Sequence, residues 1–427
     1  MAFKVELYTH EMLGIFNGFK NIIGDSCWLN RVSLISNEIK GQKCLAEYLY
    51  KENHISFLLS KYSFLVNEKK RPPLDKIENR EFYPAISFAA QAMSIIEHAP
   101  DEQKNALIRR VQGAFSNPDD MRALQLEILA ATHFVRRGYS VSWPEMDKTG
   151  NYDLLVSGIG RNGLEVECKS ISHDKGKRIH QRERIEFFDC LSVEIKAVIK
   201  NLKLGLAVVL TIPKRLPSDA KERSALSRKV VEQILKSNSK LFSDGVEVRI
   251  SEFDFSSAID KRSKSPPDRG VIDKITETVN CGAMIIGNSV GGGVMFAIKS
   301  SQDDTIIKAI FDTLKKSAKK QVSKNRAAMF LVGFYDLEMN GLNEIAEHDA
   351  NYNNAPTPLR VGVSKFLSST SCGHVAGVHF LDEGGLIPKE NGDVVNSGTA
   401  YTFKNEQSLF WDESFNNLFE SSQESLG

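Results

Sequence analysis

The chain has 427 residues, a formal net charge of +1 at pH 7, 41% hydrophobic residues and 26% charged residues. The composition is ordinary for a soluble globular protein, and the near-zero charge excludes a global positive field, so any affinity for nucleic acid must come from local patches. Six scattered cysteines without a Cys-x-x-Cys pair, no long apolar stretch and no secretory pattern at the N-terminus predict a cytoplasmic protein that spans no membrane.

Residues 1–116 predict a helical region. Apolar residues recur at helical spacing in segments such as 45–50 and 86–96, and Pro100 punctuates the pattern. The region contains no motif that carries chemistry. We expect it to pack on the core, to bind DNA or to hold a partner.

A helix is predicted from Asn117 to Gly138, followed by a short strand. Asn117 can cap the helix, Pro118 suits its first turn, and Gly138 supplies the stop. Within this helix Glu127 lies among apolar neighbours, so its carboxylate is expected to be buried, and a buried charge must be paired or neutralised. The partner is either a cation, such as Arg122 or a lysine elsewhere, or a metal ion; the alternative is an exposed edge position.

Two apolar runs, 153–157 and 164–169, predict a β-hairpin. The segment between them is rich in glycine and contains an Asn-Gly step, which is turn chemistry. Side chains alternate between the two faces of a strand, so Leu164, Val166 and Cys168 are predicted to point into a core.

The other face of the second strand carries Glu165, Glu167 and Lys169. A near-symmetric register brings Asp153, at the start of the first strand, opposite the end that bears Glu167 and Lys169. One interpretation is a solvated face with cross-strand salt bridges. Against it, Glu167 and Lys169 are about 7 Å apart along the strand, which makes them poor partners. In addition, Asp153 and Glu167 repel each other by roughly 4 kcal/mol at about 4 Å and an effective dielectric constant of ~20, which a divalent cation would remove.

The order of these elements resembles the PD-(D/E)XK nuclease superfamily. The matching features are a helix with an inward Glu127, a strand, a strand that begins with Asp153, and a strand that carries Glu167-x-Lys169. The resemblance covers residues 117–253, and Tyr152 stands where the superfamily pattern has Pro. It implies an α/β fold with a restriction-endonuclease-like mixed sheet flanked by helices, beside an N-terminal helical region and a C-terminal α/β region.

The resemblance also implies a Mg²⁺-dependent nuclease, with Mn²⁺ as a substitute. Asp153, Glu167 and the backbone carbonyl of Cys168 would hold the metal, and Glu127 would belong to the catalytic set. Lys169 would position or deprotonate the attacking water, or stabilise the charge that develops on the phosphate. The expected substrate is DNA, with RNA as the alternative, in a bacterial antiviral defence or genome-maintenance system. A homodimer or a partner protein is a further expectation.

A basic loop with a glycine follows the predicted metal-bearing strand. We expect four of its side chains to contact phosphates beside the scissile bond, against the alternative of a solvated loop. These residues are Lys175, Lys177, Arg178 and Arg182. Further on, the apolar run 205–212 predicts a central strand that is buried on both faces.

In the C-terminal part, a hairpin at 283–299, a helix near 303–322 and a strand at 327–333 are predicted. This α/β unit either extends the nuclease sheet or forms its own domain. The whole chain is thus divided into a helical region at 1–116, a nuclease core at 117–254, a linker or long loop at 255–270, a C-terminal α/β region at 271–420 and a disordered tail at 421–427.

Two other functions remain open. The chain could be a non-catalytic nucleic-acid-binding or scaffold protein that retains the fold, or a nuclease that is silent until a partner or ligand docks. A degenerate member of the superfamily should have lost the acid or the lysine, whereas Asp153 and Lys169 are both present.

Overall fold

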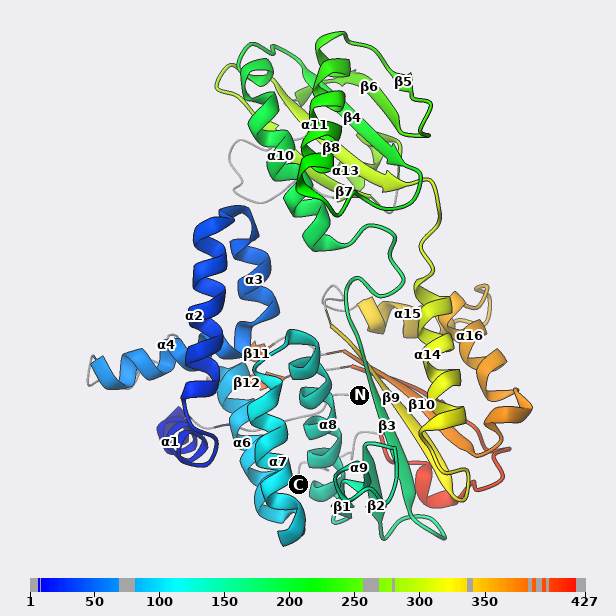
Figure 1. The fold of residues 1–427 in the computed structure, drawn as a ribbon. Coiled ribbons are helices and arrows are strands. Elements are labelled where there is room, and N and C mark those ends of the chain that lie inside the picture. Colours follow the sequence, from blue (N-terminus) through cyan, green and yellow to red (C-terminus); the bar gives the residue numbers. More distant parts are fainter. Residues whose placement is uncertain are drawn as a thin grey trace. The chain divides into compact units, whose positions relative to one another are not determined.

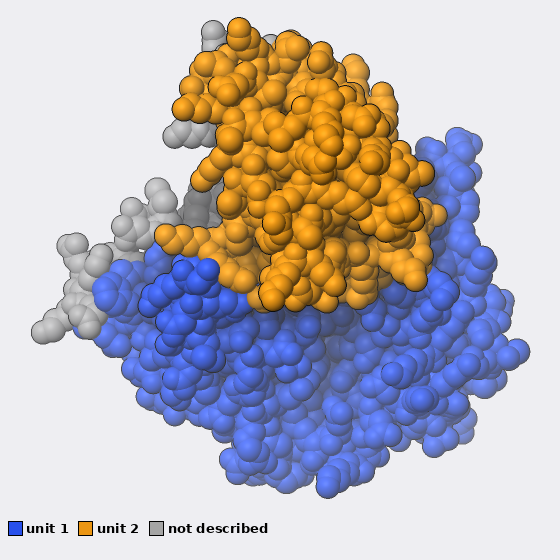
Figure 2. Space-filling view, turned by 45° about the horizontal axis from the view of Figure 1, so that its top comes forward, with its two compact units in different colours: residues 1–41, 49–175, 306–427 blue, residues 42–48, 176–305 orange. Residues whose placement is uncertain are grey.

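The computed structural model of the chain describes residues 7, 9–68, 81–255, 269–278, 281–335, 341–382, 386–388, 394–396 and 399–419. These residues form a mixed α/β protein with two mixed sheets (Figure 1). The chain divides into two compact units, coloured blue and orange in Figure 2. Unit 1 comprises residues 1–41, 49–175 and 306–427, and unit 2 comprises residues 42–48 and 176–305. No helix among the described residues has the length and apolar character that a membrane crossing requires.

The N-terminal part of unit 1 is helical, as predicted. Its helices share an aromatic core in which Phe19 stacks on Trp28 with ring centroids 5.8 Å apart, and Phe16 packs on Tyr62 at 5.0 Å. Such rings bury much of the apolar area that holds a helical layer together. The elements are η1 (Thr9–Glu11), α1 (Met12–Ile23), α2 (Ser26–Gly41), α3 (Ala46–Glu52, whose first residues belong to unit 2), α4 (His54–Glu68), α6 (Tyr83–His98) and α7 (Asp101–Ala114).

Helix α8 (Pro118–Arg136) begins where the sequence predicts it. Asn117 is the N-cap, Pro118 is the first helical residue, and Gly138 follows the end with a φ of 85°. The helix is buried along Leu124, Ala131 and Phe134 because it packs between α6, α7 and the sheet of unit 1. Both local signals, the cap and the glycine, therefore set the bounds of the helix.

The sheet of unit 1 has six strands in the order β1-β2-β3-β9-β10-β13. Strands β3, β9 and β10 are parallel, and β1, β2 and β13 run antiparallel to their neighbours. Strand β9 is a continuous apolar run, as expected for a strand that is buried on both faces, whereas β3 carries the charged residues of the candidate site. The bounds are β1 (Ser140–Ser142), β2 (Leu154–Ser157), β3 (Leu164–Ile171), β9 (Ala327–Phe334), β10 (Val375–Asp382) and β13 (Ala400–Lys404).

Helices cover both faces of this sheet (Figure 1). On one face α8 and the N-terminal helices pack against Val166 and Met329. On the other face, Phe330 and Val378 pack with α14 and α16. The remaining elements of the C-terminal part are α14 (Ile306–Lys320), α15 (Gly341–Ala350), α16 (Pro358–Leu367), η3 (Thr370–Cys372), η4 (Glu413–Phe415) and a separate hairpin of β11 (Leu386–Pro388) and β12 (Val394–Asn396).

The predicted hairpin forms with the near-symmetric register. Leu154 lies opposite Val166, so the position of Asp153 falls opposite that of Glu167. Leu164, Val166 and Cys168 point into the core shared with α8, as predicted. The turn uses glycines at 158, 160 and 163, each with a positive φ that favours glycine.

Unit 2 is built on a five-stranded sheet in the order β5-β6-β4-β8-β7. Its central strands β4 and β8 are parallel, and Leu191 and Ile195 of α10 pack on Val208 of β4. The hairpin predicted at 283–299 is β7 and β8. The elements are η2 (Lys43–Leu45), α10 (Gln181–Ile199), β4 (Gly205–Ile212), α11 (Ala220–Leu235), β5 (Lys240–Leu241), β6 (Glu247–Phe253), α13 (Arg269–Thr276), β7 (Gly282–Gly287) and β8 (Gly293–Ser300).

These units differ from the predicted core at 117–254 and C-terminal region at 271–420. The apolar run of β4 pairs with β6 and β8 rather than with the metal-bearing strand. The edge of β3 is instead filled by β9, so the predicted helix and strand near 303–333 extend the sheet of unit 1. Any buried apolar strand can satisfy such an edge, and local sequence does not select among them.

The main segment of unit 2 is inserted between β3 and α14. Its two ends are joined, because the N–H of Thr305 donates a hydrogen bond to the carbonyl of Gly176 at 2.8 Å. Insertions of whole domains are accommodated where their ends lie close together. The predicted linker at 255–270 lies mostly outside the described residues, and the predicted tail at 421–427 lies entirely outside them.

Candidate active site

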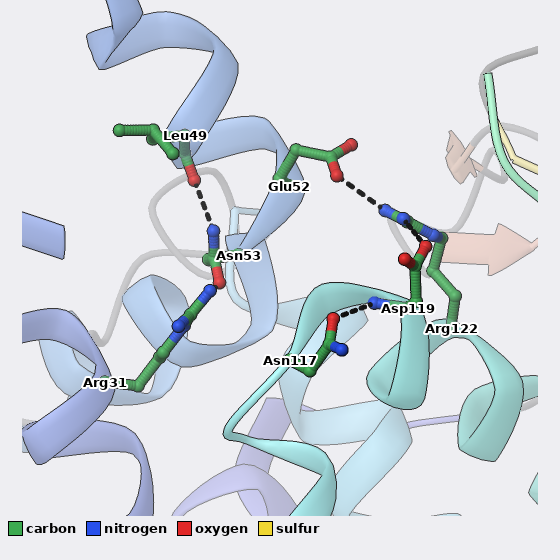
Figure 3. Close-up of polar contacts among 7 residues, drawn as sticks. All are labelled: Arg31, Leu49, Glu52, Asn53, Asn117, Asp119 and Arg122. Atoms are coloured by element: carbon green, nitrogen blue, oxygen red, sulfur yellow. Dashed lines mark hydrogen bonds and ion pairs between the residues drawn. The ribbon is translucent and has the colours of Figure 1, made fainter. Parts of the chain in front are cut away.

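The start of α8 is held by polar contacts (Figure 3). Asn117 caps the helix by accepting a hydrogen bond from the N–H of Asp119 at 3.0 Å. The guanidinium of Arg122 forms an ion pair with Glu52 at 3.0 Å and also contacts Asp119. These contacts fix the start of α8, the helix that carries Glu127.

Asp153 occupies the edge of β3 just beyond the end of β2. The β2 ladder ends at Leu154 and Val166, so the N–H of Cys168 has no partner on β2 and donates to Oδ2 of Asp153 at 2.7 Å. The carbonyl of Cys168 points to the same edge, because the N–H and C=O of one strand residue lie on the same side. Burial raises the pKa of Asp153, and the Lys169 ammonium and the Cys168 N–H oppose this rise only in part.

Just before Asp153, the backbone of Gly150 lies close to the ring of Tyr152. Tyr152 is buried in the second core of unit 1. A Cβ atom on Gly150 would lie 2.6 Å from Cε1 of Tyr152. Glycine is therefore required at 150 for the Tyr152 ring to sit in the core and for Asp153 to reach β3.

Glu167 is fully buried, and its partner is Lys169. The Lys169 ammonium forms an ion pair with Oε1 of Glu167, and no described group donates a further hydrogen bond to either Glu167 oxygen. Burial, then the charge of Asp153, raises the pKa of Glu167 to about 8. Burial lowers the pKa of Lys169, but Glu167 and Asp153 outweigh burial and raise it. The expectation that Glu167 and Lys169 would be poor partners is wrong, because the long lysine side chain folds back over the strand.

Glu127 is paired with a cation that the sequence did not suggest. Nη2 of Arg110, on α7, donates to Oε1 of Glu127 at 2.6 Å, whereas Arg122 is engaged elsewhere. The Glu127 side chain is only 7% exposed, so the exposed-edge alternative is excluded. Burial, then the charge of Asp153, raises the pKa of Glu127 to about 7, and Arg110 opposes this rise.

Asp153 therefore links Glu127 and Glu167, since its charge acts on both. A residue that sequence reasoning missed joins them. Glu145, on the short helix α9 (Pro144–Asp147), is exposed, and its charge raises the pKa of all three acids. Its only signal in the sequence is an acid a few residues before Asp153, which is too common a feature to identify a site.

Glu165 lies on the same strand face as Glu167 but has partners of its own. It accepts hydrogen bonds from the N–H of Ser323, at 2.7 Å, and from the Ser323 hydroxyl. The guanidinium of Arg326 lies 3.4 Å from Oε1 of Glu165. Both Glu165 and Glu167 have no exposed surface, so the interpretation of a solvated strand face is wrong, because β9 and α14 cover this part of β3.

The four predicted phosphate contacts are split between the units. Lys175 is the last residue of its segment of unit 1, while Lys177, Arg178 and Arg182 belong to unit 2. Arg178 donates to the carbonyl of Asp303 at 3.1 Å, and Arg182 pairs with Glu186 at 3.1 Å. Because the predicted set is divided between two units, its contact with phosphates stays a prediction.

The acids are arranged as ion pairs rather than as a ready metal cage. Within the described part of the chain, no three Asp, Glu, His or Cys side chains form a group that could hold a metal ion. Asp153 accepts a backbone N–H, Glu127 holds Arg110, and Glu167 holds Lys169. Three carboxylates face two cations, which leaves one negative charge in excess when all are ionised.

Comparisons with known proteins add no assignment to this geometry. No protein-family model, no curated protein and no solved structure matches the chain.

Proposed function

We propose that this chain is a metal-dependent nuclease that hydrolyses phosphodiester bonds, with DNA as the expected substrate. The observation that carries the proposal is that Asp153, held against β3 by the Cys168 N–H, raises by its charge the pKa values of two other buried carboxylates, Glu127 and Glu167, while Lys169 pairs with Glu167. Clusters of titratable groups with strongly raised pKa values are typical of functional sites. A purely structural role would be served better by apolar residues, since buried ion pairs contribute little to stability.

The topology of unit 1 supports a restriction-endonuclease-like fold. After β3 the chain returns to the same sheet through α14 and adds β9 in parallel. This is the helix and strand that the superfamily resemblance calls for after the Glu-x-Lys strand. Unit 2 is then an insertion into that crossover.

The donors present fit a hard divalent cation in part. Asp153, Glu167 and the carbonyl of Cys168 would hold it, since all three offer oxygen atoms at one edge of β3. Apart from Lys169, the oxygens of Glu167 have no partner among the described groups. A bound Mg²⁺ would offset phosphate charge and lower the pKa of a bound water.

The residues of the chain would then divide the remaining work. Lys169 would donate to a phosphate oxygen and stabilise the charge that develops there. Glu127, held by Arg110, would add to the negative potential at Asp153, whose own position is fixed by the Cys168 N–H. This division assigns the charge-stabilising role to Lys169, because it is held as an ammonium by Glu167.

The test is cleavage of plasmid, linear duplex, single-stranded DNA and RNA with Mg²⁺, with Mn²⁺ and with EDTA. Asp153→Asn and Lys169→Met should each lower the rate by at least ~100-fold. Glu165→Gln is the matched control, because this acid lies on the same strand face and has its own partners; it should keep metal-dependent cleavage. Equal activity of the wild type and the Asp153 variant would refute the proposal.

A second candidate is a non-catalytic nucleic-acid-binding protein with this fold. The observation that favours it is the lack of a preformed three-ligand metal group among the described residues. Calorimetric titration with Mg²⁺ separates the two functions. Heat that disappears in Asp153→Asn supports the nuclease, whereas nucleic-acid binding without any metal-dependent heat supports the second candidate. Cleavage that appears only when a partner is added identifies the partner-dependent form.

A further inference from the structure

Helix α14 presents a dense row of lysines to solvent. Lys315, Lys316, Lys319 and Lys320 are exposed on its second half, and Lys324 is exposed just beyond its end. Within the described part of the chain, none of the five forms an ion pair, although the earlier Lys308 pairs with Asp312 at 3.3 Å. The row is therefore a local positive patch on a chain whose net charge is only +1.

The opposite face of α14 fixes this row in place. Ile310, Leu314 and Ala318 are buried against the sheet of unit 1. The turn after the helix is tied to β3, because the N–H of Ser323 donates to Glu165 at 2.7 Å. The lysines are thus carried by a rigid element that packs directly on the strand of the candidate site.

The charge density of the row matches that of a nucleic acid. Lys315 and Lys320 are separated by about 7.5 Å along the helix axis, at ~1.5 Å per residue, and four charges fall within that length. Duplex DNA carries one negative charge per ~1.7 Å of its axis, so an equal length carries about four phosphates. A binding face for a single small anion would not need so many cations in a row.

Two simpler explanations cover only part of the row. Lysines in a last turn stabilise the negative end of the helix dipole, which accounts for Lys319 and Lys320 but not for Lys315, Lys316 and Lys324. A solvated face would normally mix both signs of charge. On this stretch the acid Asp312 lies before the row, and no acid follows it as far as Lys324.

The positive charges of the lysine row also act on the pKa values of neighbouring side chains. Burial raises the pKa of the Cys372 thiol, and the charges of Lys315 and Lys319 act against that rise. Burial lowers the pKa of His374, and Lys324 lowers it further. A positive potential therefore extends from α14 over the start of β10.

We propose that the lysine row of α14 binds the sugar-phosphate backbone of nucleic acid and holds the substrate of unit 1. The inference rests on the proposed nuclease function. Nucleic acid is favoured over an anionic membrane because the apolar side chains of this amphipathic helix are buried, and no large apolar side chain of α14 is exposed for insertion into lipid.

The experiment measures binding rather than cleavage. Fluorescence anisotropy with a labelled DNA duplex, in EDTA and over a series of salt concentrations, is recorded for Asp153→Asn protein with and without Lys315, Lys316, Lys319 and Lys320 changed to Gln. Each phosphate contact contributes about 0.9 to the slope of log affinity against log salt, so the slope should fall by about 3 to 4. The two double variants, 315/316 and 319/320, should each lower it by about 2.

A control variant removes the same charge elsewhere. Lys196, Lys200, Lys203 and Lys221 of unit 2, all exposed, are changed to Gln in the same background, and the slope should stay near that of the parent. An equal fall in the control, an unchanged slope in the α14 variant, or tighter binding to phosphatidylserine vesicles than to DNA would overturn the inference. Circular dichroism confirms that each variant is folded.

The outcome is separable from that of the proposed function. If the wild type cleaves nothing, but the α14 variant has a smaller slope of log affinity against log salt than its parent, the lysine row is supported and the nuclease is refuted. A protein that cleaves DNA with an unchanged slope supports the nuclease and refutes the row.

Discussion

Replacing Asp153 by Asn should stabilise the metal-free protein while it removes nuclease activity. Asn keeps an oxygen that can accept the Cys168 N–H, now at 2.7 Å, so the contact with β3 survives. What is lost is a buried charge that, after burial itself, is the largest cause of the raised pKa values of Glu127, about 7, and Glu167, about 8.

The size of the stability gain follows from the balance between repulsion of like charges and attraction of opposite charges. Two like charges about 5 Å apart repel by about 3 kcal/mol at an effective dielectric constant of ~20. Attraction of Asp153 to Lys169 and Arg110 offsets part of this repulsion, and relief of the desolvation of a buried carboxylate adds to the gain. We expect a net gain of about 2 kcal/mol near pH 8, which corresponds to a rise of about 2 °C in melting temperature for a chain of 427 residues. Near pH 5 both glutamates are protonated, so the part of the gain that comes from repulsion should vanish.

The assay is thermal unfolding in EDTA at these two pH values, repeated with Mg²⁺. Mg²⁺ should stabilise the wild type and leave Asp153→Asn unchanged, because ligands stabilise only the form that binds them. Glu165→Gln is the control; it should lose stability in EDTA, since it weakens the contact with Arg326, and it should still respond to Mg²⁺. An Asp153→Asn protein that is less stable than the wild type near pH 8 in EDTA would show that the net interaction of this charge is attractive, and the reasoning would fail.

Three further outcomes are expected. In EDTA the free energy of unfolding should fall as pH rises from about 6.5 to about 8, because the raised pKa values of Glu127 and Glu167 favour the protonated folded state; denaturant titrations in which Glu127→Gln does not flatten this part of the profile contradict this. Stability should also fall as pH drops from about 4.5 to about 3, because burial lowers the pKa of His133 to about 4 and that of His379 to about 3; between these ranges the glutamates and histidines oppose each other, and His379→Gln should reduce the acid slope. Gly150→Ala should cost about 1–3 kcal/mol and lower cleavage, because its Cβ would meet Tyr152 at 2.6 Å, whereas Gly14→Ala, with open space at its Cβ, should not destabilise the protein in the same urea titration.

Local sequence determined the parts of the site. The cap at Asn117, the glycine turn of the hairpin and the alternation along β3 act over a few residues, so they predicted α8, the existence of the hairpin and the inward Glu127. The register of the hairpin was only assumed to be near-symmetric, and the structure supplies it. The same local logic placed Cys168 in the core. These features depend on hydrogen bonds and side-chain directions that neighbouring residues set by themselves.

Tertiary structure decided what those parts meet. Strand β3 is completed by β9 rather than by the nearer apolar run of β4, and the intervening residues fold as unit 2. The pairing of β3 with β9 buries Glu165 and Glu167. It brings Ser323 to Glu165, and Glu167 is left with Lys169 as its partner. Pairing between distant strands is selected by the packing of whole faces, and several apolar runs in this chain satisfy the same edge. For the same reason, the partner of Glu127 is Arg110, a cation on a neighbouring helix that no spacing along α8 could indicate.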